Sequence, residues 1–208
     1  MLGTEAAMAQ ELDPVGEPSK RAGPVAEQHG VYVAARGYGS IADQNNIVFE
    51  DTFEVAAALG YRLSDSLRTE LEYAWRSSDI AGLNGASTAS GEFDSHSIGV
   101  HAYWDFRKNS HFRPFVGGGG GWGVQDFQFA GPADANPNFI VVADDRNDSL
   151  YWNALTGVTW HISSDYRLAF GVEYVSYSDQ AVESNIGGID GINRAYNFFL
   201  ASRWFFGS

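Results

Sequence analysis

The chain has 208 residues, enough for one domain, and its lack of cysteine excludes a disulfide framework, a zinc–thiolate site and a cysteine nucleophile. Although 44% of the residues are apolar, no run approaches the roughly 18 apolar residues of a membrane-spanning helix, so a helical membrane protein is excluded. The formal charge of −13 argues against nucleic acid as a partner, because phosphate contacts require lysine and arginine.

Residues 1–29 show neither strand nor helix periodicity, and three prolines interrupt them. We therefore expect a disordered N-terminal lead. Within it, Ala7-Met8-Ala9 resembles a signal-peptidase site, but no apolar segment precedes it. The lead is thus interpreted either as holding a signal-peptide remnant or as matching that motif by chance.

From residue 30 onward, apolar side chains recur at every second position, which is typical of β-strands with two unlike faces. The clearest run is 67–76, where Leu67, Leu71 and Trp75 alternate with charged residues. The run at 112–124 is rich in glycine, and its alternation is poor. The pattern predicts eight strands, at about 31–38, 53–62, 67–76, 97–106, 112–124, 151–161, 167–174 and 196–206.

The connections between these strands alternate in length. Those at 63–66, 107–111 and 163–165 are tight turns, whereas those at about 39–52, 78–94, 125–149 and 178–192 are long. Short and long connections alternate in this way when tight periplasmic turns and longer external loops join the strands of an outer-membrane barrel. The sequence therefore predicts an eight-stranded antiparallel up-and-down transmembrane β-barrel over residues 30–206, with both termini periplasmic.

The two faces of the strands differ in polarity. One face is apolar on most strands, which favours contact with lipid over the inward-facing apolar core of a soluble lipocalin-like barrel. The other face carries charges of both signs that can pair across a narrow lumen. The residues of this expected lumen charge network are Arg36, Arg62, Arg68, Glu70, Glu72, Arg76, His101, Asp105, Glu173 and Arg203. We expect His101 and His161 to act there as hydrogen-bonded fillers.

Aromatic residues on the apolar face lie near the strand ends, as in the two aromatic girdles of membrane barrels. The expected lipid-interface aromatics are Trp75, Trp104, Trp152, Trp160, Trp204 and Phe206. Five consecutive glycines, 117–121, are less ordinary because they weaken a strand and expose its backbone. They either leave lumen space for large groups such as Phe199 or make Gly117, Gly119 and Gly121 a contact for a partner or lipid.

The last strand resembles the terminal strand of Gram-negative outer-membrane proteins, because Leu200, Trp204 and Phe206 match its alternating apolar positions; Ser202 departs from them. The opening residues 30–39 are similar to the first strand of the opacity-protein group and its relatives, the OmpA and OmpX transmembrane domains. The resemblance covers about residues 30–206 and implies an "outer membrane protein beta-barrel domain" located in the outer membrane.

Few residues suggest a catalytic or metal-binding site. His96, with Ser95 and Ser97 at the start of the fourth strand, is the candidate for a rim hydrolase, but its spacing supplies no orienting carboxylate. The segment 144–148 is acidic but lacks calcium-loop spacing. We therefore expect no catalytic residue, cofactor or metal.

We expect an integral barrel that stabilises the envelope, presents its acidic loops for surface interaction and conducts little or no current. Its expected partners are outer-membrane lipid and lipopolysaccharide, with a protein partner at the glycine-rich strand or the external loops. Two alternatives remain open: an enzyme that modifies lipid A or phospholipid, and an accessory subunit of a larger membrane complex.

Overall fold

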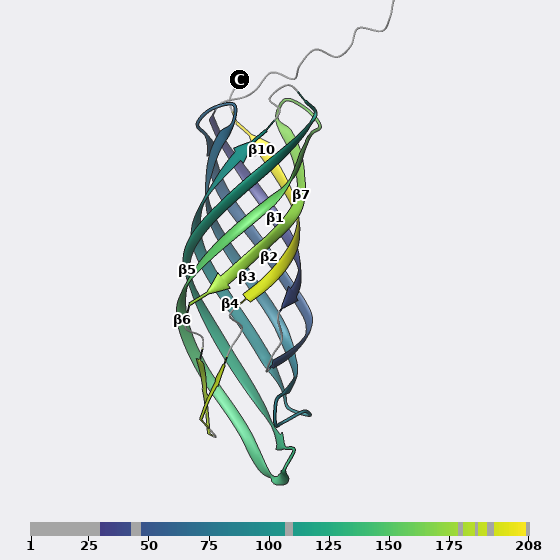
Figure 1. Ribbon diagram of the computed structural model, residues 1–208, viewed down its shortest axis with the longest axis vertical. Helices are drawn as coiled ribbons and strands as arrows, with labels where there is room; N and C mark the ends of the chain where they lie inside the picture. Colours follow the sequence, from purple (N-terminus) through teal and green to yellow (C-terminus); the bar gives the residue numbers. More distant parts are fainter. Residues whose placement is uncertain are drawn as a thin grey trace, which may run out of the picture.

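The computed structural model describes residues 30–42, 47–106, 110–178, 181–185, 187–190 and 194–206, so the expected lead at 1–29 lies outside the described residues. All ten elements of this part are β-strands (Figure 1). Their bounds are β1 Gly30–Ala42, β2 Ile47–Arg62, β3 Leu67–Leu83, β4 Ser90–Asp105, β5 Phe112–Ala133, β6 Asn136–His161, β7 Tyr166–Tyr177, β8 Ala181–Ser184, β9 Gly187–Asp190 and β10 Arg194–Phe205. No described helix is long and apolar enough to cross a membrane.

Eight of the strands form a closed barrel in the order β1-β10-β7-β6-β5-β4-β3-β2, and every neighbouring pair is antiparallel. Closure comes from β1 and β10, where Tyr32 lies opposite Phe205 and Tyr38 opposite Phe199. The prediction of an eight-stranded antiparallel barrel is therefore confirmed. β8 and β9 pair only with each other, as a separate small hairpin.

The two ends of the barrel differ. At one end, which we call the turn end, short connections join β2 to β3, β4 to β5 and β6 to β7. Serine side chains close two of these turns: Leu67 N donates to Ser64 Oγ (3.1 Å) and Tyr166 N to Ser163 Oγ (3.1 Å). The last barrel residues of β10 lie at this same end (Figure 1).

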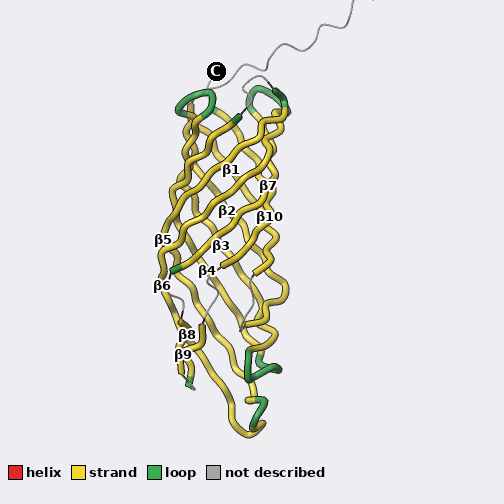
Figure 2. The backbone as a smooth tube through the Cα atoms, viewed as in Figure 1, coloured by secondary structure: helices red, strands yellow, loops and turns green. Residues whose placement is uncertain are grey.

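At the opposite end, which we call the hairpin end, β3 with β4 and β5 with β6 run on well past the ends of β7 and β10 (Figure 2). The sequence-based expectation of long loops at 78–94 and 125–149 is therefore wrong. Ladder pairing continues to Ile80 opposite Gly91, and to Pro132 opposite Ile140. A shared apolar core explains the difference, because alternate residues of these segments are apolar and can pack together.

This hairpin-end core is a cluster of buried apolar side chains beyond the barrel proper. Its members are Ile80, Ala86, Ala89, Phe93, Phe127, Phe129, Val141 and Ala143. Phe93 packs against Phe127 with ring centroids 4.7 Å apart, and Phe49 packs edge-on against Phe93 at 5.5 Å. The protruding hairpins therefore hold each other by their own packed interface.

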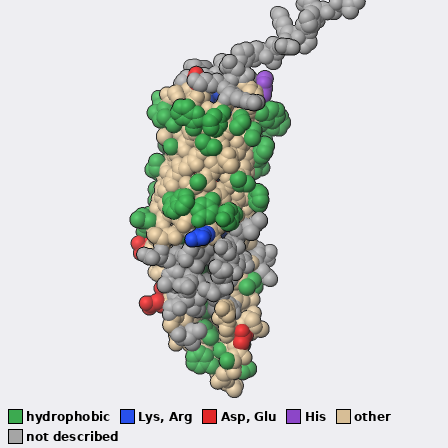
Figure 3. All heavy atoms as spheres, in the orientation of Figure 1, with side chains coloured by type: hydrophobic (Ala, Val, Ile, Leu, Met, Phe, Trp, Pro, Cys, Tyr) green, Lys and Arg blue, Asp and Glu red, His purple; other side chains and the backbone are tan. Residues whose placement is uncertain are grey.

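The polarity of the barrel wall is inverted relative to a water-soluble protein. Leu71 and Val100 point outward and are 50% and 61% exposed, whereas their neighbours Glu70 and His101 are each 1% exposed. On the face drawn in Figure 3, hydrophobic side chains gather into two bands, and fewer of them lie in the zone between the bands. The predicted assignment of apolar and charged faces is confirmed on these strands.

The glycine run of β5 makes room inside the lumen. A side chain on any of its inward glycines would overlap a lumen ring: Gly117 faces Tyr103, Gly119 faces His101 and Gly121 faces Tyr151. The sequence left two alternatives for these glycines, space in the lumen or contact with a partner. The structure shows that they leave space in the lumen, but for rings other than that of Phe199. The hypothesis of a partner contact at Gly117, Gly119 and Gly121 is corrected, because these glycines face the lumen. The glycines on the outer face of this strand are Gly118 and Gly120.

Replacing Gly119 by Ala should lower the free energy of unfolding by about 1–3 kcal/mol, because the new methyl group meets the His101 ring and the Val100 carbonyl. The matched control is Gly37→Ala, where nothing lies within 4 Å of the added atom. Urea titration of the protein folded into vesicles measures both. Equal stability of the two variants would contradict the role given to the inward glycines.

Candidate functional site

The lumen is the most distinctive site of the barrel, and it is ionic. The structure places the ten residues of the expected lumen charge network inside: Arg36, Arg62, Arg68, Glu70, Glu72, Arg76, His101, Asp105, Glu173 and Arg203 are all at most 7% exposed. They come from β1, β2, β3, β4, β7 and β10, because one residue in two on each strand points inward.

Arg36 is the central residue of the network. Its guanidinium is paired with the carboxylates of Glu70 and Glu72, and it donates a hydrogen bond to Tyr103 Oη (2.6 Å). Tyr32 Oη donates to Glu70 Oε1 (2.7 Å), which also accepts from Arg68 (2.8 Å). Side chains that project from different strands are thus tied together across the centre of the lumen.

A second group of contacts lies toward the turn end. Asp105 is 3.4 Å from both Arg62 and Arg68, and Glu70 is 3.4 Å from Arg203. The guanidinium of Arg68 also lies over the ring of Tyr103, 3.7 Å from its centroid. Arginines therefore outnumber the carboxylates that they contact in this part of the lumen.

A small chamber lies toward the hairpin end and is acidic. Glu54, Glu72 and Glu173 line it, and its volume is about 20 Å³, room for about one water molecule. Asn153 and Asn197 each donate an amide hydrogen bond to the Glu173 carboxylate. Arg76 pairs with Glu54 across β2 and β3 (3.1 Å).

Sequence reasoning left several buried lumen groups out of the network. Arg113 and Arg167 are 2% and 1% exposed, and Glu54 pairs with Arg76. Arg113 lies in the glycine-rich strand, whose alternation is hard to read. The signal that could have found it is Phe112, Pro114 and Val116, which all point outward and so turn Arg113 inward.

The six expected lipid-interface aromatics, Trp75, Trp104, Trp152, Trp160, Trp204 and Phe206, all lie on the outer surface and are 37–57% exposed. Some of these outer rings pack side by side: Tyr174 is 5.3 Å from both Trp152 and Tyr196. At the turn end, Tyr166 packs against Trp204 at 5.2 Å. Such belts are typical of the two membrane–water interfaces of a transmembrane barrel.

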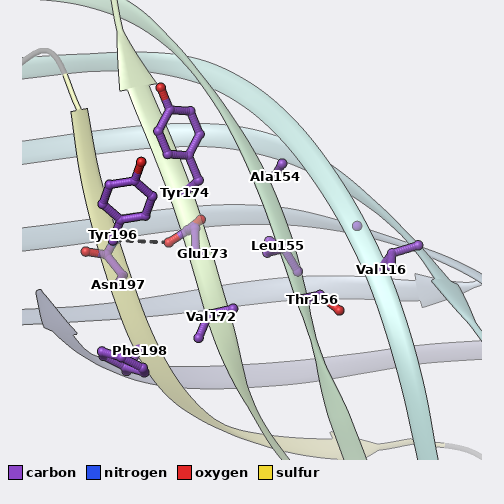
Figure 4. A pocket seen from close by; sticks show the side chains of 11 residues that line it. Val116, Ala154, Leu155, Thr156, Val172, Glu173, Tyr174, Tyr196, Asn197 and Phe198 are labelled. Carbon is purple, nitrogen blue, oxygen red and sulfur yellow. Dashed lines mark hydrogen bonds between the residues drawn. The ribbon is translucent and has the colours of Figure 1, made fainter. Parts of the chain in front are cut away.

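An apolar groove of about 700 Å³ crosses the outer surface over β5, β6, β7 and β10 (Figure 4). Ala154 and Thr156 are small, so the surface is hollowed between Val116 on one side and Val172 on the other. The groove therefore belongs to the apolar exterior of the barrel.

The rim candidates do not form a catalytic group. His96 points outward, and its Nδ1 is 2.8 Å from Tyr73 Oη, whereas Ser95 is buried on the inner face and Ser97 also points inward. Alternation along β4 thus separates the histidine from both serines. Within the described residues, no three His, Asp or Glu side chains converge to hold a metal, including those of segment 144–148.

The hairpin end carries its own polar contacts. At the tip of β5–β6, Asp134 Oδ1 accepts hydrogen bonds from Ser87 N (2.9 Å) and Ser87 Oγ (2.7 Å), which hold the pKa of Asp134 below its usual value. Asp134 N donates to Gly85 O (2.9 Å), so the tip is tied to the β3–β4 loop. Near this tip, Phe139, Ile140 and Val142 are 43–47% exposed.

A closed strand cylinder with an apolar exterior, two aromatic belts and an ionic interior defines a transmembrane β-barrel. The sequence matches the family described as outer membrane protein beta-barrel domain over residues 5–198, so the chain belongs to that family and to the bacterial outer membrane. A search of the curated proteins found no significant match.

Solved structures share the fold. Neisserial surface protein A is 20% identical, with a TM-score of 0.58 over 85% of this chain and 97% of that one. OprG from Pseudomonas aeruginosa is 13% identical, with a TM-score of 0.61 over 88% and 99% of the two chains. A major outer membrane protein from Thermus thermophilus is 10% identical, with a TM-score of 0.60 over 85% and 99%. At these identities the likeness establishes the fold alone.

Replacing Arg36 by Met should lower the free energy of unfolding by about 3–5 kcal/mol, because the buried carboxylate of Glu72 loses its paired cation. The control is Arg146→Met, whose ion pair with Asp126 (3.7 Å) is largely solvent-exposed, so its loss should cost less than about 1 kcal/mol. Urea unfolding of both variants measures the difference, and similar costs would argue against a stabilising lumen network.

Proposed function

We propose that this chain is a structural outer-membrane barrel that presents its hairpin end as an interaction surface, conducts little or no current and catalyses no reaction. The observation that carries the proposal is the packed core of the protruding hairpins. Unlike loose loops, paired strands with buried Phe93 and Phe127 hold a surface in one shape, which lowers the entropy lost when a partner binds.

The outward face near the tip supplies apolar contact area for such a partner. Phe139, Ile140 and Val142 are exposed, and exposed apolar groups gathered at one place are typical of interaction sites. Acidic side chains surround them, with Asp134 and Asp144 both exposed. We infer a protein partner that offers apolar and cationic groups, and a location of this end outside the cell with both termini in the periplasm.

Lipid and lipopolysaccharide are the proposed partners at the level of the membrane. The outer groove between Val116 and Val172 has the apolar lining that an acyl chain requires. Divalent cations would bridge the acidic hairpins to anionic lipopolysaccharide, since carboxylates are the ligands that hard cations prefer.

The lumen supports the absence of channel activity. Arg36, Glu70, Glu72 and Tyr103 meet at its centre, and the chamber beside them holds about one water molecule. A barrel of eight strands leaves an interior that side chains just fill. The separation of His96 from Ser95 and Ser97 supports a non-enzymatic role.

Wild-type protein in planar bilayers should produce no stable conductance steps, because the paired lumen side chains block ion passage. The measurement is single-channel current at increasing voltage. A stable, reproducible conductance would contradict the closed lumen, whereas changes in lipid A seen by mass spectrometry in cells that express the protein would favour the alternative of a lipid-modifying enzyme.

Changing Phe139, Ile140 and Val142 to Ser should abolish binding of protein-expressing cells to their target surface. These changes remove the apolar contact area and leave the hairpin-end core in place. The control is Val100→Ser, an outward apolar residue of the barrel wall. The folding of the tip variant is judged by its gel migration before and after boiling. Unchanged adhesion by a correctly folded tip variant would refute the tip as the interaction surface. A partner that co-purifies in mild detergent despite the tip changes would favour the accessory-subunit alternative.

A further inference from the structure

The turn end of the lumen holds a concentration of buried cations that the proposed function does not use. Five arginines, which we call the basic cluster, are at most 2% exposed there: Arg62, Arg68, Arg113, Arg167 and Arg203. They lie at the level of the turn-end aromatic belt, because Arg203 precedes Trp204 and His161 follows Trp160 in sequence. The cluster therefore sits at the mouth of the barrel.

The strand register places like charges directly opposite one another in this mouth. Arg62 faces Arg68 across β2 and β3, and Arg167 faces Arg203 across β7 and β10. His161 also lies opposite Arg167, across β6 and β7. Like charges at directly opposed positions destabilise a sheet, so this arrangement needs a compensating negative charge.

Two buried carboxylates, Asp105 and Glu70, contact arginines of the basic cluster. Asp105 contacts Arg62 and Arg68, and Glu70 contacts Arg68 and Arg203. Among the described residues, the structure shows no hydrogen-bond partner for Arg167 Nε and Nη2, for Arg203 Nη2 or for His161 Nε2. A buried charged donor without a partner is costly, and its cost falls when an anion accepts its hydrogen bonds.

The side chain of Arg167 is also held in an orientation that suits an anion. Its guanidinium lies over the ring of Phe205, 3.8 Å from the centroid. Stacking on an aromatic ring covers one face of the guanidinium plane and leaves the N–H groups at its edge available. Such a planar edge can donate two parallel hydrogen bonds to an oxyanion.

We propose that the turn-end mouth of the lumen binds a phosphate-type oxyanion between Arg167, Arg203 and His161. The guanidinium edges donate hydrogen bonds to its oxygens, and its charge offsets the repulsion between the opposed arginines. The oxyanion is either free phosphate or the phosphate of a lipid headgroup, which presents the same chemistry.

The test measures the thermal unfolding of the full chain in octyl glucoside micelles, which carry no phosphate. Sodium phosphate is added against sodium chloride at equal ionic strength. With phosphate at about 100 times its dissociation constant, the midpoint should rise by about 5 °C or more. Arg167→Gln and Arg203→Gln should each remove this rise; two variants are used in case one fails to fold.

The matched control is Arg76→Gln, which changes a buried arginine at the opposite end of the lumen that pairs with Glu54. This variant should be less stable than the wild type yet keep the full response to phosphate. An equal response in Arg167→Gln and wild type would overturn the proposal, because phosphate would then act elsewhere on the protein.

A second arm distinguishes the source of the phosphate. Phosphatidylglycerol is added to the micelles in place of the inorganic salt. A rise with phosphatidylglycerol alone that Arg167→Gln abolishes assigns the site to a lipid headgroup, and a rise with sodium phosphate assigns it to a free oxyanion. The absence of a rise with either compound in the folded wild-type protein would overturn the proposal.

Discussion

The pairing of β1 with β10 is the contact on which the rest of the structure depends. In a bilayer no water can satisfy the N–H and C=O groups of an unpaired strand edge, so the sheet must close. Closure through pairs such as Tyr32 with Phe205 divides space into lipid outside and a narrow lumen inside. One face of each strand then contacts lipid and the other faces the lumen. The alternation of apolar and polar side chains along the strands follows from that division.

The narrow lumen limits the volume of the side chains inside it, and pairing of their charges does not by itself make them fit. Long arginine and glutamate side chains and several aromatic rings share the interior, and glycine supplies the missing space where a ring approaches the wall. Gly171 against Phe199 and Gly60 against Tyr32 repeat what the glycine run of β5 does on a larger scale. The ionic network and the inward glycines are therefore two parts of one packing solution.

The two ends of the barrel differ from each other, and these ends are where a widely shared fold can acquire a specific role. The membrane zone is governed by lipid and backbone pairing, whereas the two ends are free of that constraint. At the hairpin end, the apolar core around Phe93 and Phe127 holds strands that extend beyond the barrel. At the turn end, arginines face arginines across the strands.

The alternation in sequence was enough to predict the eight strands, the turn-end connections and the faces of the strands outside the glycine-rich run 112–124, because a two-residue period directly reports which side of a sheet a residue occupies. It also predicted that Arg36, Glu70 and Glu72 would share the lumen. It could not predict that residues 125–149 pair as strands, since their apolar side chains become a core only when β3 and β4 lie beside them. Nor could it show that Gly119 faces His101 or that Arg167 faces Arg203. Those pairings depend on the register between strands, which only the closed tertiary structure sets.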